Sequence, residues 1–121
     1  MNSYDIVILG GGESGTGAAV LARRKGFRPL VSDKGFIKDK YKLLLKEEGI
    51  DFEENKHTEK IILQAEEIIK SPGIPESIPY LAEARKKGIP VISEIEFASR
   101  FTEAKLIFIT SHNMLYFKYL D

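Results

Sequence analysis

The chain has 121 residues, 43% of them hydrophobic, which suits one domain with its own core. Its 18 Lys and Arg residues balance 18 Asp and Glu residues, whereas nucleic-acid-binding domains usually carry a basic excess. Cysteine is absent, no apolar run approaches the roughly 18 residues of a membrane helix, and no secretion signal opens the chain. We therefore expect a cytoplasmic protein that has neither a nucleic-acid nor a membrane partner.

Apolar runs alternate with helix-favouring segments along the chain. The expected strands cover residues 5–9, 28–32, 50–53, 67–70, 90–92 and 105–110, and the expected helices cover residues 14–25, 37–48, 58–64, 77–87 and 94–101. Strands that alternate with helices through short loops predict an α/β fold. We expect a Rossmann-like, doubly wound, mainly parallel sheet with helices on both faces, in three α/β/α layers.

A glycine fingerprint, Gly10-x-Gly12-x-x-Gly15, lies between the first expected strand and the first expected helix. In such a fingerprint Gly10 permits the tight turn, Gly12 lets backbone approach a pyrophosphate, and Gly15 lets the helix pack close to the strand. The free N–H groups of the first helical turn then face the anion. The pattern alone also fits a glycine-rich turn that binds no ligand.

Asp33 closes the second apolar run and lies 21 residues after Gly12. A carboxylate about 20 residues beyond the glycines is the expected contact for a ribose. The alternative is that Asp33 only caps the turn before the next helix, because Asp is common in turns. The combination favours a ligand that carries phosphate.

The turn Ser71-Pro72-Gly73 ends the strand expected at 67–70. Proline cannot donate to a sheet and glycine tolerates positive φ, so the strand must stop here. At the carboxyl edge of a parallel sheet this turn would face the glycine loop across the ligand crevice. A plain connection from strand to helix is the alternative.

Metal and catalytic-triad sites are not indicated by the sequence. His57 and His112 have no carboxylate or cysteine neighbours at the spacing that such sites use. We expect surface or packing roles for both histidines, with no catalytic residue and no metal ligand in the chain.

Four segments, in their order and spacing, resemble the Mur ligases, and within them the D-glutamate-adding ligases of peptidoglycan synthesis. The segments are Leu9-Gly-Gly-Gly-Glu-Ser-Gly, Asp33, Lys70-Ser-Pro-Gly-Ile-Pro and Pro90-Val-Ile-Ser-Glu-Ile-Glu-Phe, and the resemblance covers about residues 4–110. It implies a first domain that holds the uridine nucleotide of UDP-N-acetylmuramoyl-L-alanine. The whole ligases of this family use ATP and Mg²⁺ and proceed through an acyl-phosphate.

The resemblance also implies which residues form the substrate site. The diphosphate would contact the loop and helix start at Gly10, Gly12, Glu13, Ser14 and Gly15. The uridine would lie near Asp33, Lys34 and Gly35. The opposite wall of the site would be formed by Ser71, Pro72 and Gly73. Two positions depart from the family pattern. The Glu13 carboxylate must point away from the diphosphate or contact a sugar hydroxyl, and Gly35 stands where relatives can offer a side-chain donor.

A larger departure from the family comes at the end of the chain. A Gly-x-x-Gly-Lys-Thr/Ser phosphate loop should follow the strand at 105–110, but residues 111–121 contain neither its glycines nor its lysine in that pattern. We therefore expect a UDP-binding domain at 1–93, a remnant of the ATPase domain at 94–110 and a non-family tail at 111–121. Such a truncated chain would bind no cofactor and would be inactive alone.

Apolar residues of the remnant would then need a new partner or remain exposed, among them Ile95, Phe97 and Phe101. An added edge strand, a swapped dimer or a disordered tail are the expected outcomes.

Two other functions remain open. The NAD-binding domain of a dehydrogenase shares the three fingerprint glycines and Asp33, and a nucleotide-sensing regulatory domain has a similar size. The segments that begin at Ser71 and Ser93 favour the ligase family, because the dinucleotide fingerprint does not require them.

Overall fold

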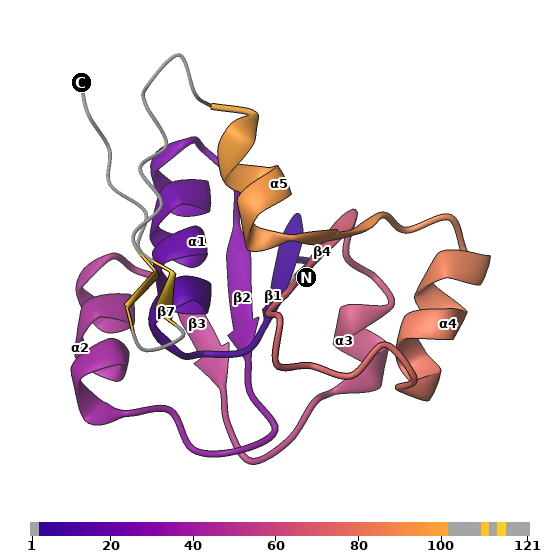
Figure 1. The fold of residues 1–121 in the computed structure, drawn as a ribbon, viewed down its shortest axis with the longest axis horizontal. Coiled ribbons are helices and arrows are strands. Elements are labelled where there is room, and N and C mark those ends of the chain that lie inside the picture. Colours follow the sequence, from indigo (N-terminus) through magenta and orange to yellow (C-terminus); the bar gives the residue numbers. More distant parts are fainter. Residues whose placement is uncertain (1–2, 102–109, 112–113, 116–121) are drawn as a thin grey trace.

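A computed structural model of the chain describes residues 3–101, 110–111 and 114–115. Five parallel strands form one sheet in the order β3-β2-β1-β4-β5 (Figure 1). The strands are β1 (Ile6–Leu9), β2 (Pro29–Ser32), β3 (Asp51–Glu53), β4 (Glu67–Lys70) and β5 (Val91–Ser93). The chain runs outward from β1 through β2 to β3, then returns to the other side of β1 for β4. The carboxyl ends of β1 and β4 therefore flank a topological switch point, where open α/β sheets bind ligands.

Helices cover both faces of this sheet, which confirms the expected α/β fold (Figure 1). One face carries α1 (Glu13–Arg24), α2 (Asp39–Glu47) and α5 (Glu94–Ser99), and the other carries α3 (Glu59–Ile62) and α4 (Pro79–Lys86). Alternate side chains of β1 serve the two faces, with Ile6 and Ile8 in one core cluster and Val7 and Leu9 in the other. Across the described part of the chain, no helix is both long and apolar enough to cross a membrane.

Every helix differs from its expected bounds at one end or at both, and the differences at α3 and α4 have local causes. Helix α4 starts at Pro79 rather than at residue 77, because proline fits the first helical position, where its missing N–H costs nothing. Helix α3 is shorter than the expected 58–64. Thr58 does occupy its N-cap position, but the Thr58 hydroxyl donates to Glu53 Oε1 at 2.6 Å instead of capping the helix.

Helix α5 packs in the same core as β1 and α1, so the expectation that its apolar residues would need a new partner is wrong. Phe97 is fully buried and packs edge to face against Phe27 and Phe101. Arg100, just beyond the helix, pairs with Glu67 of β4 through both carboxylate oxygens. The reason is local: α5 follows β5 without a loop and folds back over the sheet.

The strand expected at 105–110 lies outside the described residues, apart from Thr110. That residue begins β6 (Thr110–Ser111), which pairs antiparallel with β7 (Met114–Leu115). Strand β7 lies beside α1 (Figure 1). The dimer expected through the C-terminal segment stays a prediction.

Candidate functional site

The glycine fingerprint forms the connection from β1 to α1. Gly10 has a φ of +109°, and a Cβ atom there would come within 2.8 Å of the Ser71 Cβ. A Cβ at Gly15 would lie 1.8 Å from the Gly10 carbonyl oxygen, so only glycine lets α1 start this close to β1. Gly12 is exposed instead, and a Cβ there would meet nothing within 4 Å. Two glycines thus fix the loop, and the third leaves its backbone open to a ligand.

The start of α1 has the features of an anion site. Gly12 is the N-cap residue, and no side chain caps this end of the helix. The first intrahelical amide bond runs from Thr16 N–H to the Gly12 carbonyl at 2.9 Å. The N–H groups of Glu13, Ser14 and Gly15 therefore have no intrahelical acceptor, and the helix dipole adds positive potential there. The Glu13 Oε2 atom is buried and has no hydrogen-bond partner among the described residues.

Asp33 joins the end of β2 to the glycine loop. Its Oδ2 atom accepts the Gly11 N–H at 2.7 Å, and its Oδ1 atom accepts the Gly35 N–H at 2.8 Å. The turn-capping role that the sequence left open is therefore present, together with a second bond that reaches the fingerprint. Lys34 and Gly35 lie in this turn and are exposed.

Ser71 lies against the glycine loop on its other side. Its N–H donates to the Leu9 carbonyl at 3.1 Å, which continues the pairing of β4 with β1. Its Cβ is the atom that excludes a side chain at Gly10. Pro72 and Gly73 are exposed, and within the described residues neither is hydrogen-bonded to the glycine loop. The structure thus brings one residue of this turn to the fingerprint rather than all three.

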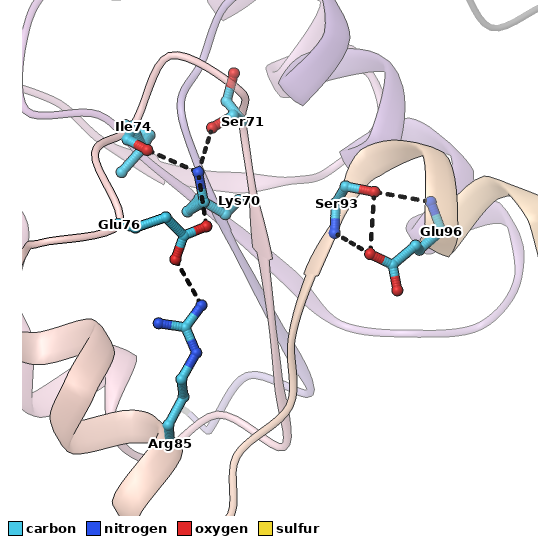
Figure 2. A network of polar contacts seen from close by, with 7 residues as sticks. All are labelled: Lys70, Ser71, Ile74, Glu76, Arg85, Ser93 and Glu96. Atoms are coloured by element: carbon cyan, nitrogen blue, oxygen red, sulfur yellow. Dashed lines mark hydrogen bonds and ion pairs between the residues drawn. The ribbon is translucent and has the colours of Figure 1, made fainter.

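Lys70 holds the turn that follows β4, and Figure 2 shows its contacts. Its Nζ atom donates to the Ile74 carbonyl at 2.7 Å and to the Ser71 carbonyl at 3.3 Å. The same ammonium pairs at 3.5 Å with Glu76, which pairs in turn with Arg85 of α4 at 2.7 Å. The Lys70 side chain is only 13% exposed. Sequence reasoning missed this role, although a cation directly before the Ser-Pro-Gly turn was an available signal.

Glu94 is a buried carboxyl group that sequence reasoning also missed. A capping box of Ser93 and Glu96 starts α5, which makes Glu94 the first helical residue (Figure 2). Glu94 is 1% exposed, and both of its carboxyl oxygens lack a hydrogen-bond partner among the described residues. Burial raises the pKa of Glu94, and the hydroxyls of Ser14 and Ser71 with the Lys70 ammonium offset only part of that rise.

A polar network lies behind Asp33, at the carboxyl ends of β2 and β3. The Ser32 hydroxyl donates to Glu53 Oε2 at 2.7 Å and lies 2.7 Å from His57 Nδ1. Because the hydroxyl has one proton, His57 Nδ1 is the donor in the second contact. Ser32 is fully buried, so this serine–histidine pair is not accessible to a substrate. His57 packs edge to face against Tyr80, in agreement with the packing role expected for it.

The charges of this network follow from its contacts. Burial acts to raise the pKa of Glu53, but hydrogen bonds from the Thr58 hydroxyl and amide and the Ser32 hydroxyl hold that pKa below its usual value. Burial lowers the pKa of His57, although the carboxylates of Asp33 and Glu53 act in the opposite direction. Glu53 is therefore an ionised acceptor and His57 a neutral donor near pH 7.

Two further kinds of feature can form functional sites: a surface hollow and a cluster of metal-ligating side chains. A hollow of about 570 Å³ beside edge strand β3 is lined by Tyr4, Leu30, Asp51 and Phe52 among others, and contains none of the predicted site residues. Within the described ranges, no three His, Asp or Glu side chains stand together as a metal site. The described residues therefore offer no fitting ligand group for the Mg²⁺ that the resemblance implies for the whole ligases.

Comparison with known proteins identifies the family. The model of the Mur ligase MurD-like N-terminal domain matches residues 4–93. The UDP-N-acetylmuramoylalanine–D-glutamate ligase of Bacteroides fragilis is 59% identical over 108 residues, which make up 89% of this chain and 24% of that protein. The enzyme of the same name from Porphyromonas gingivalis is 56% identical over 110 residues, or 91% of this chain and 24% of that protein. The chain thus spans about a quarter of the length of these relatives.

Solved structures agree in fold. A murein peptide ligase from Psychrobacter arcticus superposes with a TM-score of 0.74 at 20% identity, covering 86% of this chain and 22% of the other. A UDP-N-acetylmuramate–alanine ligase from Thermotoga maritima superposes with a TM-score of 0.65 at 19% identity, covering 83% and 23%. The chain belongs to the family of Mur ligase MurD-like N-terminal domains, the first domain of peptidoglycan ligases.

Proposed function

We propose that this chain binds the uridine diphosphate part of UDP-N-acetylmuramoyl-L-alanine, as the substrate domain of a D-glutamate-adding ligase. The names of the relatives that it resembles at 59% and 56% identity support this substrate. Because the chain matches about a quarter of those enzymes, the ATP-dependent addition of D-glutamate belongs to parts that lie outside the match. The domain then supplies binding and orientation, and alone it forms no amide bond.

The observation that carries the proposal is the meeting of the predicted segments at one edge of the sheet. The uncapped start of α1 lies between Asp33, bonded to Gly11, and Ser71, packed on Gly10. This edge is also the topological switch point between β1 and β4. A helix N-terminus with open backbone at Gly12 suits a diphosphate, because its N–H groups and dipole both favour negative charge.

Each predicted residue then has a role. The backbone at Gly12, Glu13, Ser14 and Gly15 holds the diphosphate, while Gly10 keeps the loop in shape. The turn of Asp33, Lys34 and Gly35 borders the uridine, and the turn of Ser71, Pro72 and Gly73 forms the opposite wall. The unpartnered Oε2 atom of Glu13 is an acceptor for a sugar hydroxyl.

The contacts of Asp33 limit what this carboxylate can offer to the ribose of any nucleotide. A dinucleotide-binding domain uses such a carboxylate to accept the ribose hydroxyls. Both Asp33 oxygens here already accept backbone N–H groups, at 2.7 Å and 2.8 Å. Fewer lone pairs therefore remain for a ribose diol, which NAD and a uridine nucleotide both carry, so a titration has to separate the two ligands.

An NMR titration of amide shifts tests the proposal, with UMP, UDP-N-acetylmuramoyl-L-alanine, NAD and ATP as ligands. We expect both uridine ligands to shift the amides of residues 12–15, 33–35 and 71–73, and we expect NAD and ATP to leave them in place. The UDP ligand should bind more tightly than UMP, because its second phosphate also meets α1. Shifts with NAD instead would favour the dehydrogenase alternative, and no response to any uridine ligand would overturn the proposal.

A further inference from the structure

The Glu94 carboxyl group lies where the two walls of the proposed substrate site meet. The Ser14 hydroxyl, from the second residue of α1, and the Ser71 hydroxyl, from the first residue after β4, both act on this buried carboxyl group. Neither hydroxyl reaches normal hydrogen-bond geometry with it, so both carboxyl oxygens remain buried without a partner among the described residues. Glu94 is therefore influenced by residues that we assign to the diphosphate and to the opposite wall of the site.

The negative charge of an ionised Glu94 would repel the negative charge of a bound diphosphate. A buried carboxylate without hydrogen bonds is costly, and a second anion nearby adds to that cost. The groups that act on Glu94 are the Ser14 hydroxyl from α1, the Ser71 hydroxyl from the turn and the Lys70 ammonium from β4. On its own helix, Ser93 and Glu96 are bonded to each other in the capping box. Lys70 is the one cation in this set, and it is already bound to two carbonyls and Glu76.

The hydroxyl protons of Ser14 and Ser71 also favour a protonated Glu94 when a phosphate is bound. Each hydroxyl has a single proton to donate. When Glu94 is ionised, both protons are drawn toward its carboxylate, which leaves lone pairs toward a phosphate. When Glu94 is protonated, its own proton goes to a serine oxygen, and both serine hydroxyls are free to donate to the phosphate. Binding of a proton and binding of a phosphate therefore favour each other.

We propose that Glu94 is a further residue of the substrate site, and that its carboxyl group takes up one proton when a diphosphate diester binds at the start of α1. The inference rests on the proposed function. Linkage sets its measurable consequence: the affinity for the diphosphate rises as pH falls, by up to tenfold per pH unit between the free and bound titration points. A diphosphate diester is the suitable probe, because its own phosphates do not titrate in this range.

Calorimetry of the full chain with UDP-N-acetylmuramoyl-L-alanine tests the inference. The binding heat is measured at several pH values in two buffers that differ in ionisation enthalpy, which gives the number of protons taken up. We expect uptake that approaches one proton in the pH range where free Glu94 is ionised. The Glu94→Gln variant should bind with no uptake and with an affinity that is independent of pH, because its amide cannot titrate. The exposed Glu66→Gln variant should behave like the wild type, and His57→Gln should retain the uptake due to Glu94.

A second measurement does not depend on how the variants fold. In the wild-type chain labelled with ¹³C at the glutamate carboxyl groups, the Glu94 resonance should titrate at a higher pH once ligand is bound. Binding without proton uptake, uptake that persists in Glu94→Gln, or a Glu94 titration that the ligand leaves unchanged would each overturn the inference and leave the proposed function intact. Absence of binding at every pH would overturn both.

Discussion

The two turns that face each other across the proposed site are built by opposite means. The loop from β1 to α1 owes its shape to missing side chains, because a Cβ atom at Gly15 would collide with backbone 1.8 Å away. The turn after β4 owes its shape to one side chain, because the Lys70 ammonium gathers the carbonyls of Ser71 and Ile74 (Figure 2). The first turn therefore tolerates no change at its closest contact, whereas the second can be loosened in steps by altering its charges.

The largest effect should come from the closest contact in the glycine loop. Gly15→Ala places a methyl group against the Gly10 carbonyl, and either the start of α1 or the end of β1 must move. We expect a loss of about 3 kcal/mol in the free energy of unfolding, at the upper end for overpacked sites. Urea denaturation followed by circular dichroism measures it.

Gly12→Ala is the matched control for this substitution. A Cβ at Gly12 meets open space, so the loss should stay below about 1 kcal/mol, the usual difference between glycine and alanine at an N-cap. The same control should still weaken uridine-diphosphate binding, because the methyl group would occupy the approach to the backbone. Equal stability of the two variants would refute the steric account of this loop.

The second turn should respond to the loss of its cation. Lys70→Met keeps much of the side-chain volume but leaves the Ile74 and Ser71 carbonyls without this donor and leaves Glu76 paired with Arg85 alone. We expect a loss of about 2 kcal/mol in unfolding free energy, in the range for hydrogen bonds that involve a charged group. Amide hydrogen exchange should also speed up around residues 71–76. The exposed Lys86→Met variant is the control, and an equal effect from it would show that the Lys70 contacts contribute nothing.

A smaller effect concerns the network behind Asp33. The folded pKa of Glu53 is depressed, so its stabilising contribution is present above its unfolded pKa of about 4.5 and is lost as pH falls through the lower, folded value. Glu53→Gln should therefore reduce stability near neutral pH and flatten the decline in stability below about pH 4.5. Thermal denaturation between pH 7 and pH 3 checks this, with Glu66→Gln as the control. A Glu53→Gln curve parallel to that of the wild type would contradict it.

The smallest effect should come from filling a gap beside the uridine. A Cβ at Gly35 would lie 3.6 Å from Asp33 Oδ1, an ordinary contact, so Gly35→Ser should change unfolding free energy by less than about 0.5 kcal/mol. Its hydroxyl should strengthen UMP binding by roughly two- to tenfold, the value of one added hydrogen bond. Gly35→Ala has no hydroxyl and should show no gain. If alanine strengthened binding as much as serine, the effect would not be a hydrogen bond.

The difference between local and long-range determinants explains how much of the fold and of the candidate site the sequence could predict. The glycine loop was predictable because its determinants are local: a buried strand, glycines at fixed spacing and a helix start. The meeting of Asp33 and Ser71 at this loop was predictable because the carboxyl ends of parallel strands share one edge of the sheet.

The parts that were missed depend on contacts between distant segments. The sequence around Glu94 indicates the first turn of a helix. The residues next to Glu94 in the sequence do not indicate that α1 and the turn after β4 bury it. Phe97 read as an orphan because its segment resembles the start of another domain, yet it packs on Phe27, seventy residues earlier in the chain. Lys70 lay beside a recognised turn, but its role required knowing how the carbonyls of that turn are aimed.

The bond from Asp33 to the glycine loop has a consequence for the thermodynamics of binding. The Asp33 carboxylate holds the amides of Gly11 and Gly35 before any ligand binds. The glycine loop and the turn at residues 33–35 therefore need not become ordered during association. Ordering of loops on binding costs conformational entropy that subtracts from affinity, and a rigid site avoids that cost. A nucleotide that docks between these turns should therefore lose little affinity to the immobilisation of the protein, and more of its contact energy should remain to orient the rest of the substrate.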